Sequence, residues 1–211
     1  MLFTLENVTY RHILHIPTLH IEKNKMTCLI GESGSGKSTL LKLFNKMLSP
    51  TSGTILYNGE PLTDIDAVQL RRNVSMLSQT PVMFGETITE DIEICFSFHE
   101  KEPPSITSIE EMCRQFYLHK SGDTKTDTLS GGEKQRLALA RMMLLQPNVF
   151  LLDEATSALD EKLEKQVMTT LVKQVKKLHA SLIYVTHSLE IAHHFSDTVI
   201  DVTPYSLAKE R

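Results

Sequence analysis

The segment GESGSGKST at residues 31–39 constrains this chain more than any other part of its sequence. It fits the pattern G-x-x-x-x-G-K-[ST], in which glycines let the backbone turn tightly and approach a ligand without a Cβ in the way. Successive N–H groups would converge on phosphate oxygens, and the N-terminus of the next helix would add partial positive charge. An apolar strand at 26–30 and a helix at 38–47 are predicted on either side. The segment therefore predicts a phosphate-binding loop.

The residues of this loop have separate expected tasks. Lys37 would reach the β- and γ-phosphates of a nucleotide, and Ser38 would offer its hydroxyl to Mg²⁺. The other loop residues predicted to bind the nucleotide are Gly31, Ser33, Gly34, Ser35, Gly36 and Thr39.

A second string, LSGGE at residues 129–133, comes just before the strand and acids FLLDE at 150–154. Ser130, Gly131 and Gly132 open a predicted helix over 133–145, and such a helix start is an anion site by the same logic or else a plain N-cap. Asp153 ends a buried strand, where a carboxylate without a cation would carry a heavy desolvation cost. We expect Asp153 to hold Mg²⁺.

The order of strands and helices indicates the fold class. We expect an α/β fold whose mainly parallel sheet is covered by helices on both faces. Residues 2–10 and 13–21 are predicted to pair as antiparallel strands, with Ile16-Pro17 breaking the second at an edge or bulge. A single domain over 1–211 is expected, with a core at 1–79 and 148–211 and an inserted helical subdomain at 80–147. The remaining predicted elements are strands at 54–57, 73–77, 149–152, 182–186 and 198–202 and helices at 160–178 and 189–195.

Composition narrows the class of protein. The 211 residues, 41% hydrophobic and 23% charged, suit one globular unit. A net charge of −4 makes a general nucleic-acid binder a poor candidate. The longest apolar run is far below the ~18 residues of a membrane span, and the N-terminus lacks the features of a signal peptide. Three widely spaced cysteines fit a reduced, cytosolic protein.

Together these motifs resemble the ATP-binding subunits of ABC transporters, over nearly the whole chain. The resemblance implies a P-loop NTPase (RecA-like) fold. Residues 31–38 match the Walker A loop, and 129–133 match the LSGGQ signature with Glu133 in place of the commoner glutamine. Residues 150–153 match the Walker B strand and 157–160 the D-loop. The single-residue matches are Tyr10 as the aromatic that stacks on adenine, Gln79 of the Q-loop and His187 of the H-loop.

The resemblance implies hydrolysis of ATP with Mg²⁺. Glu154 would be the general base that activates water, and His187 would hold the water and the γ-phosphate in line. Lys37 and Gln79 complete the predicted catalytic set. The predicted metal ligands are Ser38, Gln79 and Asp153. Asp160 would act in the D-loop at the dimer interface, as the N-cap of the helix that it begins, or in both ways.

The resemblance also implies partners. Two copies would close around two ATP–Mg²⁺, each signature facing the nucleotide of the other copy. A separate membrane permease would contact the stretch that begins at Gln79 and ends at Glu86, although core packing is the alternative for Met83 and Phe84. The chain would then lie in the cytoplasm, peripheral on the inner face of the cell membrane.

The motifs look most like those of small stand-alone bacterial subunits of iron or metal export. Three alternatives remain open at this point. The first is a soluble ABC-type ATPase that acts on DNA or ribosomes, against which only about fifty residues without sustained heptads separate Gln79 from Leu129. The second is a non-catalytic nucleotide-binding scaffold, which would be expected to lack Glu154 or His187. The third is another phosphate-loop enzyme such as a kinase or GTPase, which has no use for the signature.

Overall fold

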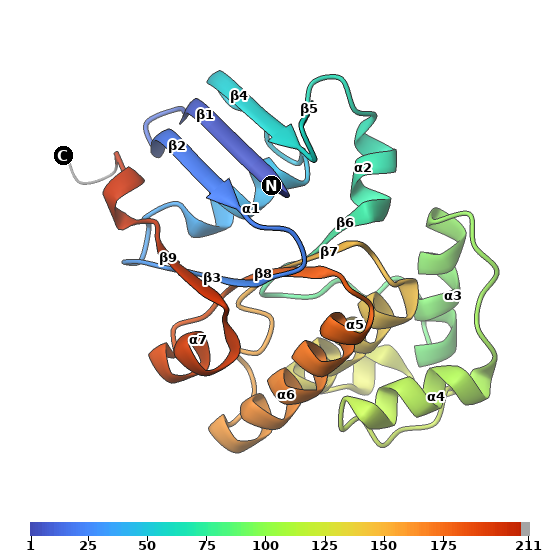
Figure 1. Cartoon of the computed structure of the whole chain (residues 1–211). Helices are drawn as coiled ribbons and strands as arrows, with labels where there is room; N and C mark the ends of the chain where they lie inside the picture. Colours follow the sequence, from blue (N-terminus) through green and yellow to red (C-terminus); the bar gives the residue numbers. More distant parts are fainter. Residues whose placement is uncertain (208–211) are drawn as a thin grey trace.

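The computed structural model describes residues 1–207 and contains two β-sheets that lie one above the other (Figure 1). The larger sheet has the order β6-β7-β8-β3-β9, and all of its strand pairs are parallel. The predicted α/β class with a parallel sheet is confirmed. The strands of this sheet are β3 (Met26–Ile30), β6 (Val74–Leu77), β7 (Val149–Asp153), β8 (Ser181–Val185) and β9 (Thr198–Asp201).

The smaller sheet is antiparallel and contains the N-terminal strands, as predicted. Its order is β2 (Leu14–Ile21), β1 (Phe3–Tyr10), β4 (Ser52–Tyr57), β5 (Glu60–Pro61). The expected break at Ile16-Pro17 does not occur, because β2 is an edge strand and the proline ring needs no ladder partner on its open side. Asn58 and Gly59, both with positive φ, form the tight turn between β4 and β5.

The larger, parallel sheet separates two hydrophobic cores. Every residue of β7 is buried, and alternate side chains point to opposite faces as strand geometry requires. Val149 and Leu151 pack toward the smaller sheet and α1 (Lys37–Phe44), whereas Phe150 and Leu152 pack toward the helices on the other face. Burial on both faces explains why the parallel strands are nearly continuous apolar runs.

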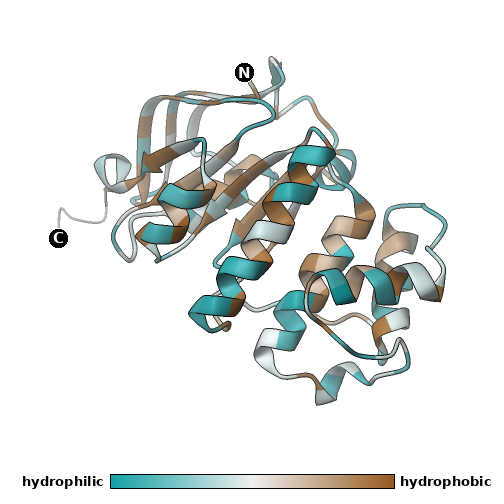
Figure 2. Cartoon of the chain, turned by 60° about the horizontal axis from the view of Figure 1, so that its bottom comes forward, coloured by the Kyte–Doolittle hydropathy of each residue, from teal (hydrophilic) through white to brown (hydrophobic). Residues whose placement is uncertain are grey.

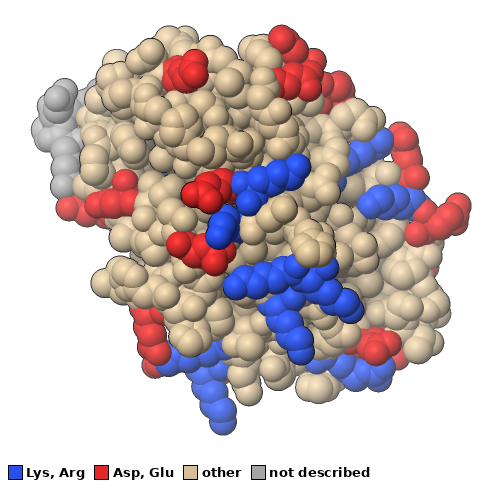
Figure 3. All heavy atoms as spheres, in the orientation of Figure 1, with Lys and Arg blue, Asp and Glu red and all other residues tan. Residues whose placement is uncertain are grey.

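The helices on the face of the larger sheet that points away from the smaller sheet are amphipathic. The long helix α6 (Glu161–Lys177) buries Val167, Leu171 and Val175 at helical spacing and exposes polar residues. In Figure 2 the helices carry teal and brown residues on the same ribbon, as expected of helices that cover a core with one face. α7 (Leu189–Phe195) lies beside α6 below the sheet (Figure 1). Acidic and basic side chains are interspersed on the face shown in Figure 3.

The segment between β6 and β7 contains three helices, which lie to one side of the sheets (Figure 1). We keep the boundaries 80–147 of the inserted subdomain as a proposal, since these helices lie inside that range. They are α3 (Ile88–Phe98), α4 (Ile106–Gln115) and α5 (Gly131–Leu145), and a short 3₁₀ turn, η1 (Thr126–Thr128), precedes α5. A second 3₁₀ turn, η2 (Thr203–Tyr205), follows β9.

One helix prediction was wrong at its end, and one helix was missed. Helix α1 ends at Phe44, three residues earlier than expected, because the chain turns at Lys46 with φ of 59°. Helix α2 (Ala67–Asn73) was not predicted. Asp66 accepts hydrogen bonds from the N–H groups of Val68 and Gln69, so this aspartate is an N-cap that could have signalled the helix.

Candidate active site

The phosphate loop connects β3 to α1 and depends on glycine at two points. Gly36 has φ of 98°, and a Cβ there would lie 2.6 Å from a methyl carbon of Leu14. Gly31 has φ of 142°, and a Cβ there would lie 2.9 Å from Ser35 Oγ. Gly36 is also the N-cap of α1 and leaves the first turn without a side-chain cap. At both positions the positive φ and the lack of room for a Cβ require glycine. The N-terminus of α1 therefore adjoins the loop.

Lys37 lies in the centre of this loop. Its Nζ donates to the carbonyl oxygens of Gly31 and Glu32, at 2.8 Å each, and the residue is buried. The hydroxyl of Ser35 is also buried and has no hydrogen-bond partner within residues 1–207. A buried ammonium that donates to two main-chain carbonyls, beside a hydroxyl without a partner in the described part of the chain, is the arrangement expected of a site that receives phosphate.

Ser38 and Asp153 come together from α1 and the end of β7. Ser38 Oγ donates to Asp153 Oδ1 at 2.7 Å, and Asp153 is buried. A hydroxyl and a carboxylate oxygen are the hard ligands that Mg²⁺ prefers beside nucleotide phosphates. The donor set therefore fits the ion that the sequence predicts.

Glu154 follows Asp153 and is contacted by two other segments. Its φ of 52° is rare for a residue with a side chain. Oε1 lies 2.7 Å from His187 Nε2, and Oε2 accepts a hydrogen bond of 2.9 Å from Gln79 Nε2. The structure thus brings together Glu154, Gln79 and His187, which are far apart in the sequence.

Lys37, Ser38 and Glu154 line one cavity of about 560 Å³, and Asp153 lies behind Ser38, to which it is hydrogen-bonded. Its wall contains loop residues that include Ser33, Gly34 and Thr39, and on the other side Gln79, Glu154 and His187. Ile13 also lines the cavity and was not predicted, since an isolated apolar side chain in a loop gives no sequence signal. The predicted phosphate, metal and base residues therefore share one site.

The position of Tyr10 in the structure does not fit its predicted stacking on adenine. The residue is only 6% exposed and packs in the core beneath the smaller sheet, while the Arg11 guanidinium lies 5.3 Å from the ring centre. Strand alternation puts Tyr10 on the same face as buried Val8. A ring without a free face cannot stack on adenine, so the structure does not support that assignment.

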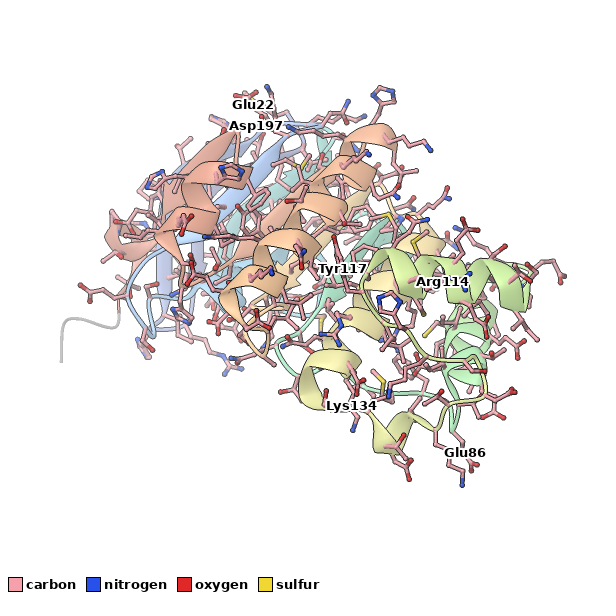
Figure 4. The ribbon with its side chains drawn as sticks, turned by 90° about the horizontal axis from the view of Figure 1, so that it is seen from below. Glu22, Glu86, Arg114, Tyr117, Lys134 and Asp197 are labelled. Carbon is pink, nitrogen blue, oxygen red and sulfur yellow. The ribbon has the colours of Figure 1, made fainter. Side chains whose placement is uncertain are left out.

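The predicted signature residues lie at the start of α5 and do not line the cavity of the same chain. Ser130 Oγ accepts a hydrogen bond from Glu133 N at 3.3 Å, and Glu133 Oε2 accepts one from Ser130 N at 2.9 Å. This capping box lowers the pKa of Glu133, chiefly through the bond from the Ser130 N–H. Figure 4 labels Lys134 in this first turn, near the outer edge of the molecule.

The D-loop lies against the start of α5 within the chain. A Cβ on Gly132 would lie 3.2 Å from the Ala158 carbonyl oxygen, so the absence of a side chain at this position permits the approach. Asp160 is the N-cap of α6, because its Oδ1 accepts a hydrogen bond of 3.0 Å from Leu163 N. The N-cap alternative for Asp160 is thereby confirmed.

Sequence reasoning missed a buried ion pair behind the Q-loop. Arg141 of α5 binds the fully buried Asp91 of α3, with 2.7 Å between Nη1 and Oδ2. Arg141 Nη1 also donates to the Val82 carbonyl, and Asp91 Oδ1 accepts a bond from Phe84 N. The pair therefore fixes the Q-loop to the inserted helices, and only the fold reveals it, because the partners are fifty residues apart.

The fold and the cavity define a P-loop NTPase. Residues 14–157 match the family model described as ABC transporter, and this chain belongs to that family, as an ATP-binding domain that couples ATP hydrolysis to transport. It is 35% identical over 210 residues to "Probable iron export ATP-binding protein FetA" of Escherichia coli (strain K12), covering 97% of this chain and 92% of that protein.

Solved structures agree with this assignment. A bacterial Atm1-family ABC exporter with ATP bound superposes with a TM-score of 0.83 and 28% identity, covering 95% of this chain and 37% of that chain. The protein cbiO1 of Clostridium perfringens, part of the ABC transporter complex cbiONQ, gives a TM-score of 0.81 and 27% identity, with 95% and 84% covered. Within residues 1–207, no helix is long and apolar enough to cross a membrane.

Proposed function

We propose that two copies of this chain close around two molecules of ATP, and that closure and hydrolysis drive a separate membrane subunit. The observation that carries the proposal is the separation of two helix starts built from glycine and serine on one chain. The start of α1 lines the cavity, whereas the start of α5 does not. A head-to-tail pair would let each α5 complete the cavity of the other copy.

Different residues of the cavity would bind the phosphates and the metal ion. Lys37 and the loop N–H groups would bind the β- and γ-phosphates, and Ser38 and Asp153 would hold Mg²⁺, with Gln79 as a third ligand. When bound, the ion would neutralise charge that develops on the phosphate oxygens. Thr39 and the remaining loop residues would complete the phosphate cradle.

Glu154 is the proposed general base. Its two oxygens are held by His187 and Gln79, which fixes the carboxylate toward the cavity. A water that binds between this carboxylate and the γ-phosphate would lose its proton to Glu154. His187, whose side chain is 64% exposed, can turn from Glu154 toward a phosphate and stabilise its negative charge.

A groove beside the Q-loop is the proposed docking site for the membrane subunit. It has a volume of about 380 Å³ and lies between the core and the inserted helices. Phe84 and Phe98 line it and are 44% and 57% exposed, and Met47 at its rim is 56% exposed. Apolar side chains around a groove suit a short amphipathic segment of a partner. Met83, by contrast, packs against the core.

The cargo and the location are proposals drawn from similarity. The likeness to the Escherichia coli iron export protein supports the export of metal ions such as iron. The chain would then lie on the cytoplasmic face of the membrane, bound to the permease at the stretch from Gln79 to Glu86, of which Phe84 lines the groove. No residue of the ATPase need contact the cargo.

The test uses a Glu154→Gln variant, which should bind ATP, lose most turnover and form a stable ATP-dependent dimer. Glu161→Gln is the matched control, because Glu161 lies on the exposed first turn of α6. Size-exclusion chromatography with light scattering measures the dimer. Near-normal hydrolysis by Glu154→Gln would remove Glu154 from the role of base.

The same variant tests the membrane partner. Incubated with ATP and Mg²⁺, it should retain a stoichiometric multi-span protein from solubilised membranes of its host, identified by mass spectrometry. Recovery of ribosomes, DNA or only soluble proteins would reject the proposed permease contact. A recovered permease should carry the cargo in reconstituted vesicles, where iron uptake or release can be followed directly.

A further inference from the structure

Gln135 of α5 is a buried polar residue that the proposed chemistry does not use. It is 3% exposed and lies one turn beyond Ser130 on the signature helix. A buried amide carries a desolvation cost unless its donors and acceptor are paired. Its partners therefore indicate why a polar side chain occupies this position.

The partners of Gln135 come from both loops that flank the base. Nε2 donates to the Gln79 carbonyl oxygen at 3.1 Å and lies 3.5 Å from Ser157 Oγ. Oε1 accepts a hydrogen bond from Ala158 N at 3.1 Å. These partners fix the orientation of the amide. If it were flipped, Oε1 would face the Gln79 carbonyl oxygen and Nε2 would face the Ala158 N–H.

Each of these loops also holds Glu154. The side chain of Gln79 donates to Glu154 Oε2 at 2.9 Å, so the Gln79 main chain and side chain connect Gln135 to the base. On the other side, Ser157 N donates to the Glu154 carbonyl oxygen at 3.1 Å. Gln135 thus supports the two segments that set the position of Glu154 without contacting its carboxylate.

We infer that Gln135 is a positioning residue, which holds the Gln79 main chain so that the Gln79 amide meets Glu154 and also fixes the D-loop to the signature helix. A shift of α5 would then move the Q-loop and the D-loop together. This inference rests on the proposed roles of Gln79 and Glu154. It adds a residue through which the start of α5 and the base are connected within one chain.

The test is a double-mutant cycle between Gln135→Leu and Gln79→Ala. Leucine has a similar volume but removes all the hydrogen bonds of the amide. Steady-state hydrolysis gives kcat and KM, and a fluorescent ATP analogue gives the Kd. Gln135→Leu should lower kcat about tenfold or more and change the Kd by less than about twofold. In the Gln79→Ala background, the further loss should be under about twofold.

Two further variants keep the test decisive. Gln135→Glu retains the acceptor for the Ala158 N–H but places a carboxylate against the Gln79 carbonyl, so it should lose kcat as well. If Gln135→Leu does not fold, Gln135→Glu replaces it in the double-mutant cycle with Gln79→Ala. Gln174→Leu is the control, because Gln174 joins α6 to α4 through Gln115, away from the cavity. It should leave kcat unchanged.

The outcomes separate this inference from the proposed function. If Gln79→Ala alone hydrolyses ATP like wild type, the proposed role of Gln79 is wrong. If Gln79→Ala is slow but the two losses multiply in the double variant, Gln135 does not act through Gln79 and the inference is overturned. A parallel loss of ATP affinity and kcat in Gln135→Leu and Gln135→Glu would also overturn it, because it would show a general structural role.

Discussion

The starts of α1 and α5 are both built from glycine and serine, yet they differ in what occupies the first turn. The start of α1 has Gly36 as its N-cap and no side-chain cap, with Lys37 next in the chain. The start of α5 is closed by its own side chains, since Ser130 and Glu133 exchange hydrogen bonds. One end is open and carries a cation, whereas the other is capped and carries an anion.

This difference indicates different uses of the same helix dipole. An uncapped N-terminus beside a lysine attracts phosphate without help from another molecule. In α5, the Glu133 carboxylate already satisfies the Ser130 N–H and opposes a second negative charge. We therefore expect α1 to bind the nucleotide first, and α5 to contact it when a second copy of the chain approaches.

The largest effect should come from the loss of the cation at the open end. Lys37→Ala removes the ammonium from the centre of the loop, so ATP binding should weaken and hydrolysis should fall by roughly 10²- to 10³-fold. Fluorescent nucleotide titration and steady-state kinetics measure both. Lys42→Ala, in the last turn of α1, is the control. Equal ATP affinity in wild type and Lys37→Ala would contradict the proposed role of the ammonium at the start of α1.

A change at the capped end should separate binding from closure. Ser130→Arg places a long side chain at the start of α5, so ATP should bind each chain normally while the dimer fails to form. The Kd for ATP and the ATP-dependent mass from light scattering are the two measurements, best made in the Glu154→Gln background. Normal dimer formation by the double variant would show that α5 does not face the second nucleotide.

The smallest effect concerns the capping box itself. Glu133→Ala should lower the free energy of unfolding by roughly 0.5–1 kcal/mol at pH 7, since a cap and a favourable charge at the helix N-terminus are lost. The pKa of Glu133 is lower in the folded protein, so its charge stabilises the fold above its ordinary pKa, and this stabilisation is lost as pH falls through the lowered value.

Urea denaturation of wild type and Glu133→Ala at pH 7 and at acid pH measures this contribution. The difference between the two proteins should shrink at acid pH. Lys120→Ala, which removes the 3.4 Å ion pair with Glu133 at the surface, should have the smaller effect. A difference that grows with acidity would contradict the account of the cap.

The residues that could be predicted from the sequence are those whose spacing reflects local geometry. The loop around Lys37 and the acids that end β7 belong to strand-loop-helix units, so their positions follow from short motifs. Tyr10 was misassigned although alternation with Val8 already indicated a buried face. Gln135 could not be predicted, because its burial depends on loops that meet α5 only in the folded chain.

The most direct test of the central claim mixes two defective chains. Lys37→Ala lacks a working loop and Ser130→Arg lacks a working signature, so neither homodimer has a complete site if each site uses α1 of one copy and α5 of the other. A mixed dimer has one complete site of two, so mixing should raise hydrolysis well above that of either variant alone, to no more than about half of the wild-type rate. Recovery on mixing is the predicted result, whereas the absence of any recovery would contradict a site shared between two copies.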